Sequence, residues 1–278
     1  MEALLSLAFD NLSSKDGLKI RKGIRQIEGL LAQICLPNPA PRAKEKRRPS
    51  TQVLSDSTVP MSLQQVAEDP AFREFFRLQE SFEWNVSSQL ITCLETLLGM
   101  PNGTQSNQLI LSALDLLQGI LLLHPPSRAL FRREIFMMLL LDLLDATNPP
   151  AIQAQTLLVL VTALLATPES TRTFEQMDGL LTVASLFKSR GTSKEVKMKV
   201  VEFLYFYLMP ETSSNPERPG HQRRPSKHVP IKAGPPGQVD VRSIRTTEEK
   251  QQMLGQYLSN VADLVEDLRE NTLFAIAV

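Results

Sequence analysis

The chain has 278 residues with 42% hydrophobic content, and 30 acidic side chains balance its 30 Lys and Arg side chains. A chain of this length and composition can bury a large core, which predicts an ordinary soluble protein. Its formal net charge of +0 argues against a nucleic-acid-binding protein, because such proteins normally carry a basic domain or stripe.

Neither secretion nor membrane insertion is expected from the sequence. The N-terminal segment lacks a basic region, and Glu2 and Asp10 interrupt its apolar part, so it is a poor signal peptide. The apolar runs 109–123 and 156–167 fall short of the ~18 apolar residues that a membrane span requires. Both runs are therefore predicted to be buried helices.

Residues 1–36 are predicted to form the N-terminal helices of the fold. Within 18–35, apolar side chains recur at intervals of three and four, as on one face of an α-helix. They are Ile20, Ile24, Ile27, Leu31 and Ile34. Residues 37–68 are rich in Pro, Ser, Thr, Lys and Arg and have few large apolar groups, so they are predicted to be a disordered basic linker. Asp69 then supplies a helix cap, and Pro70 suits the first helical position.

Residues 69–211 are predicted to form a helical core. Breaks rich in Pro and Gly separate segments of about 15 to 20 residues, so successive helices must fold back on one another. The sequences around Phe131 and Phe174 align without gaps, 43 positions apart. A repeat of this length suits an armadillo or HEAT unit. The predicted fold is all-α, an armadillo/HEAT-like helical solenoid in which each unit buries its apolar face against its neighbours.

The strongest helical pattern covers residues 171–211. It predicts one helix that Arg190 and Gly191 end and a second helix that a capping box of Thr192 and Glu195 begins. Four aromatic residues crowd the end of the second helix, in a chain that is only 6% aromatic. They are Phe203, Tyr205, Phe206 and Tyr207. They belong to the core or to a partner-binding ridge, and both can hold for different faces of the helix, so all four are candidate partner-binding residues.

Residues 212–245 are predicted to be a second disordered basic linker, and residues 246–278 contain a C-terminal amphipathic helix. Thr246 and Glu249 match the capping box that would begin this helix, which is predicted to run to about residue 271. Its apolar residues alternate spacings of four and three, as in a coiled-coil seam. They are Leu254, Leu258, Val261, Val265 and Leu268. These candidate partner-binding residues either dock back on the solenoid or enter a groove of a partner.

The two linkers share the motif Arg-Arg-Pro-Ser, which ends at Ser50 in the first and at Ser226 in the second. Upstream arginines suit protein kinases with acidic clefts, because guanidinium groups pair with carboxylates. Each motif alone is compatible with solvent-exposed linker sequence that has no specific role. Because the motif occurs twice, Ser50 and Ser226 are candidate phosphorylation sites. A phosphate there would offset the basic charge of the linker.

No catalytic motif is found in the sequence: it has no Gly-rich phosphate loop, Gly-x-Ser-x-Gly elbow or kinase catalytic loop. The three histidines lack companion ligands for a metal. Cys35 and Cys93 lie in helical contexts that favour reduced core thiols, and neither is followed by the arginine of a thiol phosphatase loop. Burial would raise the pKa of such thiols. We therefore expect no catalytic residues, no metal and no cofactor.

Three stretches carry a family resemblance: IRKGIRQIEGLLAQICLP, FEQMDGLLTVASLFKSRGTSKEVKMKVVEFLYFYLMPE and TTEEKQQMLGQYLSNVADLVEDLRE. They resemble the fungal cell division control protein 14 family of the septation initiation network, which is unrelated to the phosphatase of that name. The resemblance implies a non-catalytic subunit that binds a germinal-centre, Ste20-like protein kinase. It also implies action in the cytoplasm at the spindle pole body, with its components as partners, and promotion of septum formation and cytokinesis.

The expected function is a kinase-binding regulatory subunit that docks through residues 194–209 and the final helix, with no nucleic acid and no membrane insertion. The alternative is a general armadillo-type scaffold or adaptor that binds peptides without a kinase. A row of Asn and Trp on successive units would favour that alternative, but the sequence has one tryptophan, Trp84.

Overall fold

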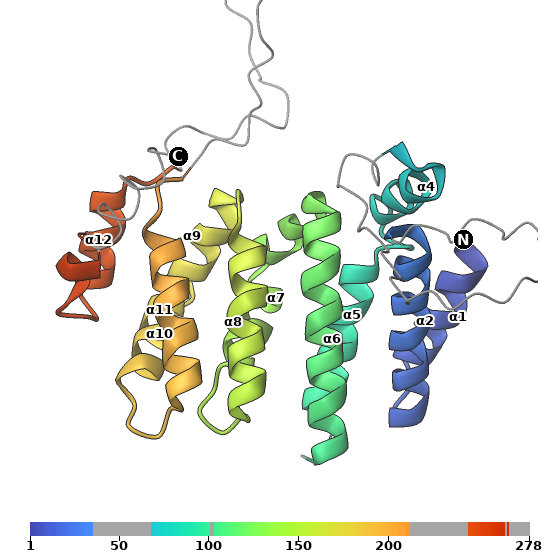
Figure 1. Cartoon of the computed structure of the whole chain (residues 1–278), viewed down its shortest axis with the longest axis horizontal. Coiled ribbons are helices and arrows are strands. Elements are labelled where there is room, and N and C mark those ends of the chain that lie inside the picture. Colours follow the sequence, from blue (N-terminus) through green and yellow to red (C-terminus); the bar gives the residue numbers. More distant parts are fainter. Residues whose placement is uncertain (36–67, 101–102, 212–243, 265, 267–278) are drawn as a thin grey trace, which may run out of the picture. The chain divides into compact units, whose positions relative to one another are not determined.

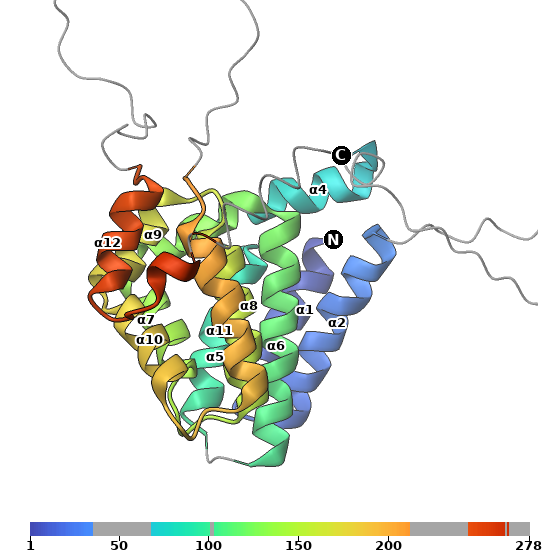
Figure 2. The same cartoon turned by 60° about the vertical axis from the view of Figure 1, so that its left-hand side comes forward.

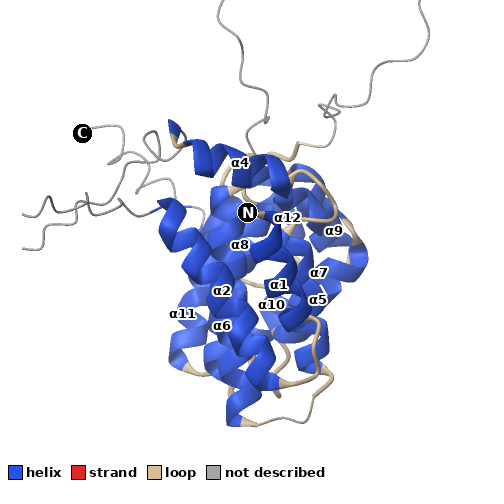
Figure 3. Ribbon diagram, turned by 90° about the vertical axis from the view of Figure 1, so that its right-hand side faces the viewer, coloured by secondary structure: helices blue, strands red, loops and turns tan. Residues whose placement is uncertain are grey.

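The computed structural model describes residues 1–35, 68–100, 103–211, 244–264 and 266. Every regular element in these ranges is a helix (Figure 3), which confirms the predicted all-α class. The chain divides into two compact units, residues 1–127 and residues 128–278. The solenoid arrangement stays a prediction, and the predicted linkers 37–68 and 212–245 lie almost wholly outside the described residues.

The first unit is built from helices that are joined by short turns where the chain is described (Figure 1). They are α1 (Glu2–Leu12), α2 (Gly17–Cys35), α4 (Pro70–Gln79), α5 (Val86–Leu98) and α6 (Thr104–Leu123). α2 confirms the predicted helix 18–35, and it buries Ile20, Ile24 and Ile27. α1 and α2 can approach closely because Gly23 has no side chain: a Cβ at this position would lie 2.8 Å from the carbonyl oxygen of Ala8.

α6 is long and apolar, with a mean hydropathy of 1.4, and it is the one described helix whose length and composition would also suit a membrane span. In the structure it packs against α5 and α2. Leu114, Leu117, Ile120 and Leu121 are completely buried there. These contacts support the interpretation of α6 as a core helix of the first unit.

His124 ends α6 in a buried position. Its Nδ1 lies 2.8 Å from the hydroxyl oxygen of Ser127, and its ring packs edge-on against Phe76 with 4.4 Å between ring centroids. Burial lowers the pKa of His124 from 6.5, although the negative charge of Glu80 opposes this shift. The folded state therefore favours the neutral imidazole.

This burial predicts a pH dependence of stability. Below about pH 6.5 the unfolded chain binds a proton at His124 while the folded chain does not. The free energy of unfolding should then fall with decreasing pH, by at most about 1.4 kcal/mol per pH unit between the unfolded and the folded pKa. Urea unfolding at several pH values between about 7 and 5.5 should show a steeper fall for the natural chain than for His124→Gln. Parallel pH profiles would contradict the prediction.

The second unit contains two successive helix triplets. Its described elements are η1 (Pro125–Arg132, a 3-10 helix that begins in the first unit), α7 (Glu134–Leu143), α8 (Pro150–Leu164), α9 (Pro168–Gln176), α10 (Gly179–Lys188), α11 (Lys194–Leu208) and α12 (Thr247–Gly255). The order η1, α7, α8 recurs as α9, α10, α11, so the predicted 43-residue repeat is present in the helices. Phe131 and Phe174, the residues that define the repeat, are both completely buried.

The predicted single helix over residues 171–190 is wrong, because the chain breaks between α9 and α10. Asp178 takes the left-handed conformation with φ 56°, which a continuing helix does not allow. Gly179 is required beside it, since a Cβ there would lie 2.2 Å from Cε2 of Phe174. The predicted capping box at the start of α11 is also wrong: Ser193 caps α11 by accepting a hydrogen bond from the backbone N–H of Val196.

The capping box of the final helix is confirmed. In α12 the Thr246 hydroxyl accepts from the backbone of Glu249, and the Glu249 carboxylate accepts from the backbone of Thr246. The predicted continuous helix to residue 271 is wrong, because α12 ends at Gly255 and turns occupy residues 256–260 before a helical segment resumes at 261–264. The apolar seam predicted from spacings of four and three therefore does not lie on one helix.

Candidate partner-binding surface

α8 has an unusual composition for a helix that is not fully covered. None of its 15 residues is charged, yet one side of it faces outward. Leu158 and Val161 on that side are half-buried, and Leu165, directly after the helix, is 39% exposed. Outward helix faces normally carry charged residues, so an uncharged outward side indicates a surface that contacts another molecule.

α11 packs beside α8 (Figures 1 and 2) and also has apolar side chains on its outward side. Met198 is 54% exposed and Met209, directly after the helix, is 50% exposed. Val201, Tyr205 and Phe206 between them are half-buried. We call the outward apolar residues of the two helices the α8–α11 face. It comprises Leu158, Val161, Leu165, Met198, Val201, Tyr205, Phe206 and Met209.

The structure separates the four aromatic residues that the sequence predicted as partner-binding. Phe203 and Tyr207 are buried in their own unit, and the Phe203 ring meets Phe174 edge-on at a centroid distance of 5.5 Å. They are core residues, which corrects the prediction for these two. Tyr205 and Phe206 lie on the α8–α11 face and stay candidate partner-binding residues. Helical spacing distinguishes the two pairs, because residues 203 and 207 are one turn apart on the buried stripe.

A pocket of about 230 Å³ lies at the C-terminal end of this face. Leu164 and Leu165 line it from the end of α8, and Phe206, Met209 and Pro210 line it from the end of α11. The chain bends sharply at the edge of the pocket, where Ala166 takes the left-handed conformation with φ 55°. Its volume is large enough to hold an apolar side chain of a partner.

A cluster of charged side chains lies next to this pocket. Glu175 of α9 has a side chain that is only 2% exposed. The hydroxyl of Tyr207 donates to it at 2.7 Å, Nη1 of Arg172 lies 2.8 Å away, and Nε of Arg245 lies 3.0 Å away. Burial raises the pKa of Glu175 even though Tyr207 and Arg172 oppose this shift. Burial together with the Glu175 charge raises the pKa of Tyr207.

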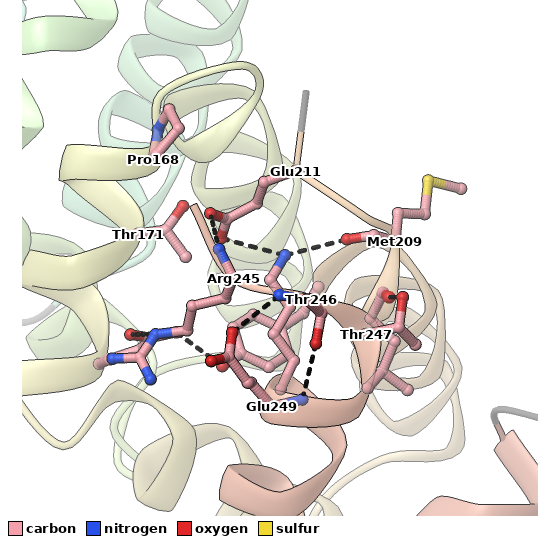
Figure 4. Close-up of polar contacts among 12 residues, drawn as sticks. Pro168, Thr171, Met209, Glu211, Arg245, Thr246, Thr247 and Glu249 are labelled. Carbon is pink, nitrogen blue, oxygen red and sulfur yellow. Dashed lines mark hydrogen bonds and ion pairs between the residues drawn. The ribbon is translucent and has the colours of Figure 1, made fainter. Parts of the chain in front are cut away.

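A second carboxylate completes the same network (Figure 4). Glu211 pairs with Arg172 and with the ammonium of Lys250, whose Nζ lies 3.2 Å away. The backbone N–H of Arg245 donates to Glu211 at 3.0 Å, and Lys250 donates to the carbonyl of Met209 at 2.9 Å. Burial lowers the pKa of Lys250. We call these two carboxylates and the groups bound to them the ionic clasp.

The ionic clasp holds the C-terminal part of the chain against α11. The hydrogen bond from the backbone N–H of Arg245 to Glu211 joins two residues that are 34 positions apart in the sequence. α12 packs on α11, and Leu254, Leu258 and Val261 are buried. The structure thus favours docking back over capture by a partner, which corrects the partner-binding prediction for these three. Val265, Leu268, Ser50 and Ser226 lie outside the described residues.

Burial raises the pKa of the Cys93 thiol to about 12, so this cysteine is not a thiolate nucleophile near neutral pH. No cluster of three or more metal-ligating side chains occurs among the described residues. The structure provides an apolar face, a pocket at one end of it, and an ionic clasp whose Glu211 and Lys250 also line that pocket.

Comparison with known proteins gives a consistent match. The family model described as "Cell division control protein 14, SIN component" matches residues 1–274. The chain is also similar to the protein named "Cell division control protein 14" from Schizosaccharomyces pombe, with 28% identity over 277 residues that cover 96% of this chain and 94% of that protein. No solved structure matches the chain.

Proposed function

The chain belongs to the cell division control protein 14 family of SIN components, and we propose that it acts in cell division as a non-catalytic binding subunit of a germinal-centre, Ste20-like protein kinase. In this proposal it positions or activates the kinase at the spindle pole body and so promotes septum formation and cytokinesis. The observation that carries the proposal is the α8–α11 face, because it places apolar side chains of two neighbouring helices on the outward side of the second unit.

A binding subunit works only through a preference for one state of its partner. A rigid surface serves this purpose well, since it loses little conformational freedom when it binds. The ionic clasp supports such rigidity, because it fixes the end of α11 to α9 and α12 at the edge of the pocket. Apolar residues around a pocket are also where binding energy concentrates in protein interfaces.

Met209 is the residue we expect to contribute most to kinase binding among the exposed ones. Met209→Asp should weaken kinase binding by about 2 kcal/mol or more, or roughly 30-fold, because it places a charge at the rim of an apolar pocket. Phe206→Ala should act in the same direction. Binding should be measured by titration calorimetry, with circular dichroism to verify that each variant is folded.

Met138→Asp is the matched control, because Met138 on α7 is 49% exposed but lies outside the α8–α11 face. Its affinity for the kinase should stay within about twofold of the natural chain. Equal losses in Met209→Asp and Met138→Asp would show that the α8–α11 face is not the docking surface.

The function itself is tested by purification of the tagged full chain from dividing fungal cells, followed by mass spectrometry and a protein kinase assay of the eluate. We expect a Ste20-like kinase in stoichiometric amount. Recovery of other partners without any kinase would refute the kinase-binding proposal and favour a general adaptor.

A further inference from the structure

We infer that the α8–α11 face binds an amphipathic helix whose apolar side packs on this face and whose acidic residues contact the basic N-terminal end of α11. The inference rests on the proposed function for the identity of the partner, the kinase. The chemistry of the docking segment follows from the arrangement of apolar and charged residues along α8 and α11.

The apolar residues of the face form two rows. Met198, Val201 and Tyr205 on α11 and Met209 directly after it are separated by three, four and four residues, which places them on one side of the helix. At 1.5 Å per residue this row is about 16 Å long. Leu158, Val161 and Leu165 form a second row on the neighbouring α8. A helix that lies along two such rows buries one apolar side, as in other helix-in-groove complexes.

The two ends of the face differ. At the C-terminal end of α11 the apolar pocket can hold one large apolar side chain of the docking helix. At the N-terminal end of α11 the surface is basic. We call this end the basic corner, formed by Lys188, Arg190, Lys194 and Lys197. The difference between the ends gives the docking helix a defined direction along the face.

The basic corner is available for an acidic partner. Lys188, Arg190 and Lys194 are exposed, and Lys197 is half-buried. No ion pair to these four residues exists within the described part of the chain. Residues 188–199 contain one acidic residue, Glu195. The net charge of this stretch is therefore positive. The N-terminal dipole of α11 adds to this positive potential, and complementary charge fixes the register of a partner.

A basic peptide fits this surface poorly. Two exposed carboxylates on α11 adjoin the α8–α11 face, Glu195 and Glu202. Oε2 of Glu202 is paired with Nζ of Lys199 at 2.7 Å, and Glu195 lies among the cations of the basic corner. A basic peptide would thus meet the four cations of the basic corner with Glu195 as the acidic residue among them, and the excess of like charge costs binding energy. Nucleic acid fits poorly as well, because α8 offers no charged residue for phosphate contacts.

Charge reversal of the basic corner tests the inference with the kinase. The triple variant Lys188→Glu, Arg190→Glu, Lys194→Glu of the full chain should bind the kinase at least about tenfold more weakly and with a smaller dependence on salt. The control reverses three exposed cations of α2: Lys19→Glu, Lys22→Glu, Arg25→Glu. Its affinity should stay within about twofold. Unchanged affinity of the basic-corner variant would overturn the inference and leave the proposed function intact.

A second measurement tests the surface without the kinase. Two helical peptides as long as α11, 15 residues, share the same apolar residues, and one carries Glu where the other carries Lys. The full chain should bind the acidic peptide at least about tenfold more tightly. The triple variant Lys188→Glu, Arg190→Glu, Lys194→Glu should lose this preference, whereas Met209→Asp should weaken the binding of both peptides. Equal binding or preference for the basic peptide would overturn the inference. If the chain prefers the acidic peptide but captures no kinase, the inference on surface chemistry is supported and the proposed function fails.

Discussion

Replacement of Glu211 by alanine is expected to lower the free energy of unfolding by about 3–5 kcal/mol. The side chain is only 8% exposed and pairs with Arg172 and Lys250. Its removal leaves the buried ammonium of Lys250, itself 4% exposed, without its ion-pair partner. It also deprives the backbone N–H of Arg245 of its acceptor. Denaturant unfolding of the second unit measures this loss.

Glu202→Ala is the matched control for Glu211→Ala. Glu202 is also paired with a lysine, Lys199, but its side chain is 55% exposed, and such surface pairs contribute about 1 kcal/mol or less. Limited proteolysis should in addition show faster cleavage near α12 in Glu211→Ala, since the ionic clasp no longer holds it. Equal stability losses in the two variants would mean that the ionic clasp does not anchor the C-terminal part of the chain.

Replacement of Phe203 by alanine is expected to cost about 3–5 kcal/mol of stability. Its ring is completely buried and lies against Phe174 at 5.5 Å and Phe206 at 6.3 Å between centroids. A cavity of aromatic size between α9 and α11 cannot close without movement of both helices. Any loss of kinase binding by Phe203→Ala should then be proportional to the fraction of the variant that is unfolded. It should disappear under conditions in which the variant is fully folded.

Met198→Ala gives the opposite pattern. Met198 is on the same helix but 54% exposed, so its truncation should change stability by about 0.5 kcal/mol or less and still weaken kinase binding. If Phe203→Ala weakens binding in a fully folded sample while Met198→Ala has no effect, our assignment of core and surface on α11 is wrong.

Much of the fold could be predicted from the sequence, because it depends on local patterns. The apolar spacing of Ile20, Ile24 and Ile27 identifies α2 and its buried side, and the alignment of Phe131 with Phe174 identifies the repeat. The break at Asp178 could not be predicted in this way. The apolar spacing continues from Phe174 through Leu180, so the pattern reads as one helix although the backbone changes direction.

The candidate site was predictable only in part. The aromatic cluster identified α11, and helical spacing could have assigned Phe203 to the core and Phe206 to the surface. The lack of charge in α8 is visible in the sequence, but it is equally compatible with complete burial. The ionic clasp has no sequence signal, since Glu175 and Tyr207 are 32 residues apart and Lys250 and Met209 are 41 residues apart. Only the fold brings such distant residues together.

Methionine oxidation of the full chain, with and without the bound kinase, tests the central claim most directly. Met198 and Met209 on the α8–α11 face and Met138 on α7 have closely similar exposed fractions, so peroxide should oxidise all three at comparable rates in the free chain. Bound kinase should slow the oxidation of Met198 and Met209 by about tenfold or more and leave Met138 unchanged. Unchanged rates at Met198 and Met209 in a saturated complex would show that the kinase binds elsewhere and would contradict the account.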